Sequence, residues 1–258
     1  MRTELIDHMG DDLRVVNAAR VSFDKESALE PIIEDRKGLK TEWDYDDYGS
    51  LQPETRVAMV PTLVGHKLSE ADQKLIRYLA KHDHFSPFTH CTITLRETVP
   101  IFVARQRFKH TVGFSYNEVS RRYVDDTPDL YMPDEWRKRP EGSVKQGSSD
   151  EPVIDWTPWY DISAGTIYGR DVVSDFYYHA LNTYEYLLES GVCPEQARMV
   201  LPQSMMTSYY VTGSLMAFAR AYKLRADGHA QKEIRDLAAQ WDQIIRPLFP
   251  VSWSALCD

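Results

Sequence analysis

A strand pattern joined directly to a helix pattern constrains the fold of this chain more than any other feature. Residues 91–99 read CTITLRETV, with apolar side chains at alternate positions over the first half, which is typical of a strand with one buried face. Pro100 follows, and proline is tolerated at the first position of a helix. We therefore predict a strand over 91–99 and a helix over 100–110 that carries basic side chains at its end.

Helical patterns flank this strand on both sides. Asp11 and Ser69 precede amphipathic stretches and are suitable N-caps. Further helices are predicted from Asp171 to a stop at Gly191, from Pro194, over 215–224 and over 229–245. The chain has 258 residues, enough for one large domain with a real core. The order of elements predicts a compact α+β domain.

Two segments depart from these patterns. Residues 24–62 are charged, contain scattered proline and glycine, and have weak periodicity. Residues 134–165 include PEGSVKQGSSDEP, which has the composition of a solvated loop. We interpret both as surface excursions rather than domains. They could extend subunit contacts, cover a substrate, or bind a partner.

Composition narrows the class of protein. Lys and Arg number 30 against 39 Asp and Glu, a formal charge of −9, which disfavours nucleic-acid binding. We find no apolar run long enough to span a membrane and no signal-peptide hydrophobic region. The three cysteines, Cys91, Cys193 and Cys257, are widely spaced and fit free thiols in a reducing compartment. We expect a cytoplasmic protein that binds neither membranes nor nucleic acid.

A basic segment contrasts with this acidic average. Residues 105–123 read RQRFKHTVGFSYNEVSRRY and combine cations, hydroxyls, one amide, one carboxylate and aromatic rings. Cations bind phosphate by charge-assisted hydrogen bonds, and the polar and aromatic side chains can read and stack on a ring. The segment suits a nucleotide or a phosphorylated cofactor; the alternative is a solvated basic face beside a turn.

Two smaller clusters contain residues that could bind a metal or a substrate. The H-x-H spacing in KHDHFSPFTH (81–90) is compatible with zinc or iron, but nothing in the sequence completes a recognised site, so we expect no metal and mainly structural histidines. In LRADGHAQKEIR (224–235), Arg225 and His229 share a face if the helix is continuous, whereas Gly228 could break it. Arg225 and Arg198 could also simply pair with surface acids.

Familiar catalytic motifs are missing from the sequence. We find no G-x-G-x-x-G, phosphate-binding P-loop, G-x-S-x-G or C-x-x-C pattern. The basic segment contains no cysteine. If a pyrimidine is processed there, a cysteine of that segment is not the nucleophile.

Six blocks in order resemble one known family. They are HMGDDLRVVNAARVSFD (8–24), KHDHFSPFTH (81–90), PIFVARQ (100–106), SYNEVSRRY (115–123), ESGVCPEQARMVLP (189–202) and LRADGHAQKEI (224–234). Together they resemble the flavin-dependent thymidylate synthases, the ThyX family, over most of the chain outside the two excursions.

The resemblance implies a fold and an activity. It implies one α+β domain over 1–258, with an antiparallel sheet, packed helices and insertions at about 24–62 and 134–165. It also implies a homotetramer whose active sites are shared between subunits. Such enzymes use FAD to reductively methylate dUMP to dTMP, with methylenetetrahydrofolate as carbon donor and NADPH as reductant.

The resemblance also implies site residues. The dUMP contacts fall on Gln106, Lys109, Glu118, Val119, Ser120, Arg121, Arg122, Arg198 and Arg225, with Arg225 as the catalytic residue that polarises the pyrimidine. The FAD contacts fall on His84, Ser86, Lys109, His110, Thr111, Glu118, Ser214 and Arg220.

The signature motif of the family is altered in this chain. Family members have Arg-His-Arg where this chain has Lys109-His110-Thr111, so one cation is missing at the expected FAD phosphates. We expect Arg107 or Arg220 to replace it. The altered motif leaves two alternatives open: a pyrimidine nucleotide hydroxymethylase on the same scaffold, and a non-catalytic nucleotide- or nucleic-acid-binding protein.

Overall fold

A computed structural model describes residues 1–45, 51–141, 148–154, 159–161, 165–167 and 169–258. The strands are β1 (Arg2–Met9), β2 (Glu30–Tyr45), β3 (Leu51–Lys67), β4 (Thr92–Pro100), β5 (Phe114–Glu118), β6 (Trp159–Asp161), β7 (Gly165–Ile167) and β8 (Met206–Ser214). The helices are α1 (Asp12–Arg20), α2 (Glu70–Lys81), α3 (Ile101–Arg107), α4 (Gly169–Glu189), α5 (Pro194–Ala197), α6 (Leu215–Arg225), α7 (Lys232–Leu248) and α8 (Pro250–Cys257). Short 3-10 turns are η1 (Val21–Phe23), η2 (Ser86–His90) and η3 (Arg198–Val200).

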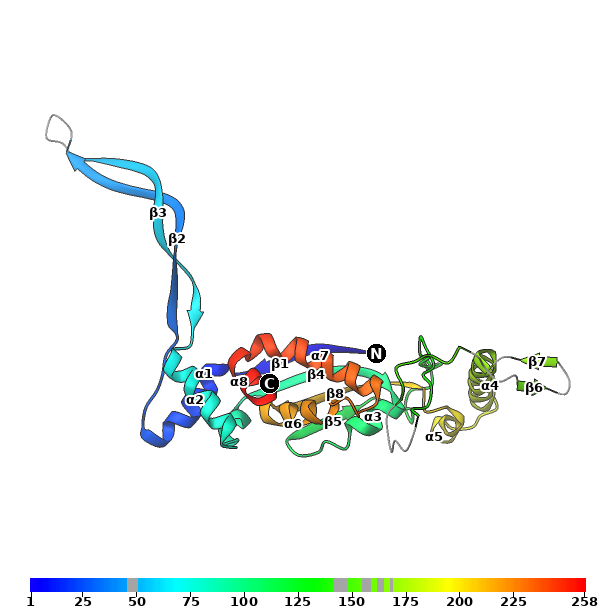
Figure 1. Cartoon of the computed structure of the whole chain (residues 1–258). Coiled ribbons are helices and arrows are strands. Elements are labelled where there is room, and N and C mark those ends of the chain that lie inside the picture. Colours follow the sequence, from blue (N-terminus) through cyan, green and yellow to red (C-terminus); the bar gives the residue numbers. More distant parts are fainter. Residues whose placement is uncertain (46–50, 142–147, 155–158, 162–164, 168) are drawn as a thin grey trace.

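A four-stranded antiparallel sheet forms the centre of the molecule (Figure 1). Its strand order is β1-β4-β8-β5, and each neighbouring pair is antiparallel. The inward side chains of β4 and β8 pack with α6, α7 and α8 in one hydrophobic core. The outward side chains of these strands are polar and hydrogen-bond across the ladder, as in the 2.9 Å contact between the Thr94 and Thr212 hydroxyls. The predicted α+β class is confirmed.

The predicted strand is present, but its partner was missed. Ile93 and Leu95 are fully buried, as the alternation of residues 91–99 predicts. Strand β8 pairs with β4 along its full length, yet the sequence analysis assigned no strand there. Its inward positions include Thr207 and Gly213, so polar and small residues interrupt the apolar alternation that marks a strand.

The helix starts were predicted well and some helix ends were not. The Asp11 carboxylate accepts a hydrogen bond from the Arg14 amide (2.9 Å), and the Ser69 hydroxyl accepts one from the Asp72 amide (3.1 Å), so both are N-caps. The helix expected over 100–110 ends at Arg107, which places Lys109 and His110 in the turn that follows.

The break between α6 and α7 settles another alternative. The helix does not continue through Gly228, because α6 ends at Arg225 and α7 begins only at Lys232. In the intervening turn, the Asp227 carboxylate accepts a hydrogen bond from the His229 amide (2.8 Å). Arg225 therefore lies at the C-terminal end of α6, facing the turn that follows α3.

A long two-stranded ribbon projects from the end of the body that holds α1 and α2 (Figure 1). Strands β2 and β3 pair antiparallel from Glu30–Lys67 at the base to Tyr45–Leu51 near the tip. We call residues 30–67 the arm. The sequence analysis expected a surface excursion over 24–62 with weak periodicity. The described residues form a ladder that extends further, to Lys67, with one register shift between Ile32 and Ile33.

The second predicted excursion is described only in part. Within 134–165, residues 142–147, 155–158 and 162–164 lie outside the described residues. Arg137 forms an isolated bridge with Pro152, and the β6–β7 pair precedes α4. Within the described part of the chain, no helix is long and apolar enough to cross a membrane.

Candidate active site

A first cavity, of about 640 Å³, opens where the end of β5 meets the turn after α5. Its lining includes five consecutive residues that the resemblance assigns to dUMP, Glu118, Val119, Ser120, Arg121 and Arg122, together with Arg198. Met205, Met206 and Ile101 supply apolar lining. The fold therefore brings residues 118–122 and 198, far apart in the sequence, to one cavity.

The charged side chains of this cavity differ in the hydrogen-bonding or ionic partners that they have. The Thr207 hydroxyl donates to Glu118 Oε1 (2.6 Å), which fixes the carboxylate. Arg121 forms an ion pair with Asp126 (3.0 Å). Arg122 donates only to the Ser120 hydroxyl (3.2 Å), and Arg198 only to a backbone carbonyl (3.2 Å). Among the described residues these two guanidinium groups have no carboxylate partner, so they are available to an anion.

A second cavity, of about 570 Å³, is lined by Gln106, Arg225, Asp227 and His229. Two further residues of the predicted dUMP set, Gln106 and Arg225, therefore lie apart from the six in the first cavity. Lys109 is exposed in the turn after α3, and it lines neither of these cavities. In one copy of the chain, the structure divides the predicted dUMP site into two parts.

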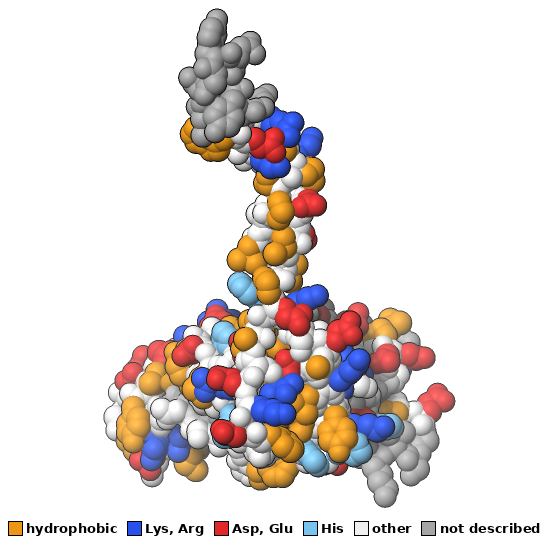
Figure 2. Space-filling model, turned by 90° about the vertical axis from the view of Figure 1, so that its left-hand side faces the viewer, with side chains coloured by type: hydrophobic (Ala, Val, Ile, Leu, Met, Phe, Trp, Pro, Cys, Tyr) orange, Lys and Arg blue, Asp and Glu red, His pale blue; other side chains and the backbone are white. Residues whose placement is uncertain are grey.

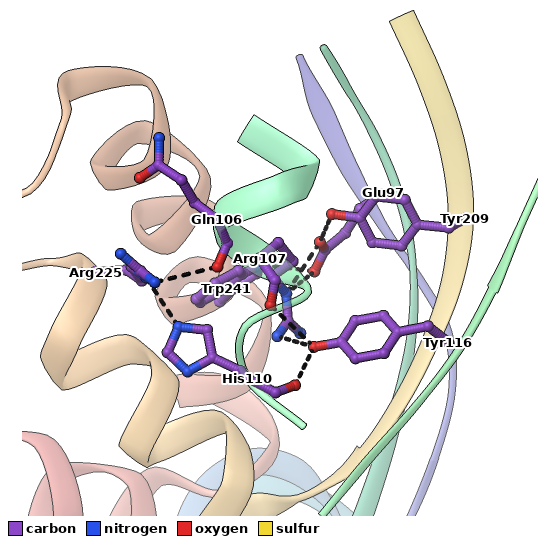
Figure 3. Close-up of polar contacts among 8 residues, drawn as sticks. All are labelled: Glu97, Gln106, Arg107, His110, Tyr116, Tyr209, Arg225 and Trp241. Carbon is purple, nitrogen blue, oxygen red and sulfur yellow. Dashed lines mark hydrogen bonds and ion pairs between the residues drawn. The ribbon is translucent and has the colours of Figure 1, made fainter. Parts of the chain in front are cut away.

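Two contacts orient Arg225 in the second cavity (Figure 3). Its Nε donates to His110 Nε2 (2.9 Å), and its Nη2 donates to the backbone carbonyl of Gln106 (3.1 Å). Because Nε2 accepts this bond, the neutral His110 ring carries its proton on Nδ1. Burial, together with the nearby charges of Arg225 and Arg107, lowers the pKa of His110 to about 4. The imidazole is thus a neutral acceptor at ordinary pH.

A buried ion pair lies behind this contact (Figure 3). Arg107 Nε is 3.2 Å from Glu97 Oε2, and both side chains are fully buried. The Tyr209 hydroxyl (2.6 Å) and the Trp241 indole N–H (2.9 Å) also donate to Glu97. The Arg107 guanidinium lies 4.4 Å from the centre of the Phe114 ring and 4.6 Å from the centre of the Trp241 ring, contacts that favour a cation.

The buried pair is connected to the turn that carries His110. Arg107 Nη1 donates to the Tyr116 hydroxyl (2.7 Å), which in turn donates to the backbone carbonyl of His110 (2.7 Å). Desolvation raises the pKa of Tyr116 to about 12, which keeps this hydroxyl protonated as a donor. Glu97, Arg107 and Tyr116 together hold the backbone from which His110 reaches Arg225.

This burial excludes one predicted role. Arg107 was expected as a possible substitute for the missing motif cation at the FAD phosphates. That expectation is wrong for Arg107, because its side chain is fully enclosed and paired with Glu97. Arg220 remains suitable, since it is exposed on α6.

The other predicted flavin residues lie on three neighbouring elements. His84 and Ser86 are exposed in the loop after α2, and the Arg220 guanidinium lies 5.3 Å from the centre of the Phe85 ring, which brings this loop to α6. Ser214 is the N-cap of α6 and accepts from the Ala217 amide (3.2 Å). Thr111 is exposed beyond His110. Gly113, with φ of +78°, packs against Ala217, where a Cβ atom would come within 3.0 Å.

The histidines of residues 81–90 form ring contacts. Tyr78 lies 4.4 Å from His82 and 6.0 Å from His84, measured between ring centres. Among the described residues, no three His, Cys, Asp or Glu side chains are grouped so that they could hold a metal ion.

The thiols differ in exposure. Desolvation raises the pKa of both Cys91 and Cys257 to about 12, so neither is a ready nucleophile. Cys193 is exposed, but it is not among the described residues that line the two cavities.

Sequence reasoning missed several residues that organise the site. Thr207 fixes Glu118, and Glu97, Tyr209 and Trp241 surround Arg107. Tyr116 was expected to stack on a ligand ring, whereas its hydroxyl accepts a hydrogen bond from Arg107. One signal was present: Glu97 occupies an inward position of the predicted strand 91–99. A carboxylate on a buried face requires a partner. The sequence does not show that Trp241 is one of the partners of Glu97, because the two residues are far apart along the chain.

Comparison with known proteins identifies relatives over nearly the whole chain. The family described as "Thymidylate synthase complementing protein" matches residues 4–251. A flavin-dependent thymidylate synthase of Thermotoga neapolitana is 35% identical over 252 residues, covering 98% of this chain and 88% of the relative. One of Thermosipho africanus is 32% identical over 252 residues, covering 97% and 88%.

A solved structure with a similar fold adds a second enzyme type. It is the UMP/dUMP methylase PolB from Streptomyces cacaoi, bound with 5-Br dUMP. Its TM-score is 0.68 at 27% sequence identity, and the match covers 98% of this chain and 93% of that one. The same methylase has also been solved bound with 5-Br UMP.

Proposed function

The chain belongs to the family of flavin-dependent thymidylate synthases and is an enzyme, and from this premise we propose that it reductively methylates dUMP to dTMP. The observation that carries the proposal lies in the first cavity, where the guanidinium groups of Arg122 and Arg198 have no carboxylate partner among the described residues and lie with the fixed carboxylate of Glu118. Two such cations suit the phosphate of a nucleotide, and the carboxylate suits its polar ring or sugar.

Arg225 polarises the pyrimidine in this proposal. His110 Nε2 and the Gln106 carbonyl accept from two of its donor groups, and Arg225 lines the second cavity. A guanidinium held in this way stabilises negative charge that develops on the pyrimidine when its C5 carbon reacts with the carbon donor. Since His110 is neutral, it orients Arg225 without adding a second charge.

Both parts of the divided site are needed for this chemistry. The phosphate-binding residues 122 and 198 line one cavity, and Arg225 lines the other. We propose that the chain forms a homotetramer in which the first cavity of one copy meets the second cavity of another. Support comes from this division within one copy and from the shared active sites that the family resemblance implies.

The residues proposed for FAD have the chemistry that the cofactor requires. Lys109 and Arg220 are exposed cations with no carboxylate partner among the described residues, and Ser86, Thr111 and His84 add exposed hydrogen-bonding groups. Phe85 holds Arg220 by a ring contact. Such a set fits a pyrophosphate. When bound, FAD supplies the hydride that completes the methyl group, with NADPH as its source and methylenetetrahydrofolate as the carbon donor.

UMP is a second candidate substrate. PolB, similar to this chain in fold and sequence, is a UMP/dUMP methylase, and it has been solved with both 5-Br dUMP and 5-Br UMP. On that basis we propose that the first cavity of this chain accepts a ribose as an alternative to deoxyribose.

An anaerobic assay tests the proposal. Purified enzyme is incubated with FAD, NADPH and methylenetetrahydrofolate labelled in the transferred carbon, with dUMP, with UMP or with neither. We expect labelled dTMP from dUMP by mass spectrometry. A labelled 5-hydroxymethyl product would show that the enzyme is a hydroxymethylase and not a methylase. Absence of FAD binding under all conditions would contradict the proposal.

A further inference from the structure

The arm carries an exposed apolar face that its own chain does not cover. From Ile33 towards the tip, beyond the register shift at Ile32, pairs such as Ile33–Leu63 and Leu39–Val57 place the odd-numbered residues of both strands on one face. Six large apolar side chains on this face are between 57% and 74% exposed: Ile33, Leu39, Trp43, Val57, Met59 and Leu63. Figure 2 shows hydrophobic side chains along the stem of the arm, from the point where it leaves the body.

The opposite face is polar and internally paired. Glu42 forms ion pairs with Lys40 (2.7 Å) and Arg56 (2.7 Å), and Arg36 pairs with Glu34 (3.1 Å). On the same face, Val60 packs over Gly38, where a Cβ atom would come within 2.5 Å of its side chain. The arm is therefore amphipathic, with one face suited to water and one suited to a partner.

An amphipathic ribbon of this kind requires a partner surface. An isolated two-stranded hairpin is at best marginally stable in water, and soluble proteins rarely leave a long apolar strip exposed. The part of this face between Ile33 and Leu39 is roughly 20 Å long and about 10 Å wide. Two such faces in contact would bury on the order of 500 Å² in total, less than a specific interface needs alone, so this contact adds to other contacts between copies.

The arrangement of residues on this face is complementary to itself. Arg36 and Val60 are paired in register, and they lie midway between the pairs formed by Ile33 and by Leu39. Three residues away on either side lie the apolar pairs Ile33–Leu63 and Leu39–Val57. One residue away lie Asp35 on one side and Lys37 on the other, which are charges of opposite sign.

We propose that the apolar face of the arm packs against the same face of a second copy of this chain. A two-fold axis at the level of Arg36 places Ile33 of one copy opposite Leu39 of the other, and Asp35 opposite Lys37. The charged groups that interrupt the apolar strip are then paired. A lipid surface or an unrelated apolar partner would leave them unpaired, which costs free energy. The inference concerns assembly and does not depend on the proposed reaction.

Charge reversal tests the contact with a matched control. Asp35→Lys leaves a lysine at both positions 35 and 37, and Lys37→Asp leaves an aspartate at both, so each variant repels a copy of itself. Each alone is expected to raise the dissociation constant of the full-length protein roughly tenfold or more in sedimentation experiments. An equimolar mixture of the two variants restores association, because their charges are complementary. Arg36→Asp makes a similar charge change on the opposite face and is expected to leave association unchanged.

Cross-linking tests the register independently of other contacts between copies. Ile33→Cys and Leu39→Cys variants, both in a Cys193→Ser background, are mixed and treated with a bismaleimide that spans about 10 Å, the usual separation of packed sheets. We expect a 33–39 cross-link between copies and little 33–33 cross-link, since those positions lie roughly 20 Å apart along the strands.

Several results would overturn the proposal. They are equal weakening by Arg36→Asp, failure of the mixed charge variants to associate, and a wild-type mass that none of the arm substitutions changes. Preferential 33–33 cross-linking would also reject this register. Because none of these measurements uses activity, they are separate from any failure of the proposed reaction.

Discussion

Arg225 is the residue on which the proposed chemistry depends most directly. Its position follows from two side-by-side contacts, to His110 and to the Gln106 carbonyl. We predict that Arg225→Ala abolishes dTMP formation and leaves FAD binding and the oligomeric state largely intact, since Arg225 is only part-buried and lies at the end of α6. Turnover and flavin absorbance of the purified variant are measured. Arg77→Ala, on the exposed side of α2, serves as a control. Turnover like that of the wild type in Arg225→Ala would refute the assigned role.

His110 gives the site a specific dependence of stability on pH. Its pKa is lowered from 6.5 to about 4 in the folded protein. As the pH falls from 6.5 towards 4, the unfolded chain takes up a proton that the folded chain does not, so the free energy of unfolding decreases. Above pH 6.5 this contribution is constant.

We predict that His110→Gln removes this part of the pH dependence. Glutamine retains an acceptor for Arg225 but does not titrate. Urea unfolding of both proteins at several pH values between 4 and 7 measures the difference. The stability difference between variant and wild type is expected to change in favour of the variant as the pH is lowered. A difference independent of pH would show that His110 has the same pKa in the folded and unfolded chains, contrary to the prediction.

The Glu97–Arg107 pair is structural rather than exposed to ligands. We predict that Glu97→Gln lowers the free energy of unfolding by about 3–5 kcal/mol, because Arg107 would remain buried without its counter-charge. Replacing both residues, as in Glu97→Leu with Arg107→Met, is expected to cost less than the sum of the single changes. A double-mutant cycle from urea unfolding measures the coupling. Additive effects would contradict the pairing.

At the scale of elements, Asp12 joins the two ends of the chain. Its carboxylate accepts from the amides of Val251 (2.8 Å) and Ser252 (2.9 Å) in the first turn of α8. We predict that Asp12→Ala lowers the free energy of unfolding by about 1–2 kcal/mol through loss of this cap. Thermal unfolding compared with an exposed control, Glu26→Ala, measures it. Equal stability of the two variants would contradict the capping role.

How far the sequence predicted these elements depended on whether their signals were local. The caps at Asp11 and Ser69 and the alternation of β4 are local, and all three were predicted correctly. Strand β8 was missed, because Thr207 and Gly213 on its inward face are explained only by their contacts with Glu118 and Phe114.

The arm shows the same limit. Its charged face and its apolar face alternate in the sequence, but proline and glycine within it obscure the period. The pairing of Gly38 with Ala58 and the packing of Val60 over that glycine become apparent only in the folded ribbon. The sequence identified a surface segment but did not show whether it contacts another subunit, a substrate or a partner.

At the scale of the whole molecule, the sequence did not predict that the dUMP-binding residues of one copy are divided between two cavities. The resemblance assigned residues 106, 109, 118–122, 198 and 225 to one substrate. One copy of the chain distributes all of them except Lys109 over two cavities. No sequence pattern shows which cavities meet, because that depends on the assembly. We therefore propose that a complete site requires two copies of the chain.

Mixing two inactive variants tests this claim most directly. Arg198→Ala disables the first cavity and Arg225→Ala the second, so each protein alone is expected to be inactive. After subunit exchange in equal amounts, a site built from two copies is intact when each contributes its undamaged cavity, which occurs in about one quarter of sites. We predict recovery of dTMP formation to about one quarter of the wild-type rate. Recovery of no activity, under conditions where mass spectrometry shows mixed oligomers, would contradict a site shared between copies.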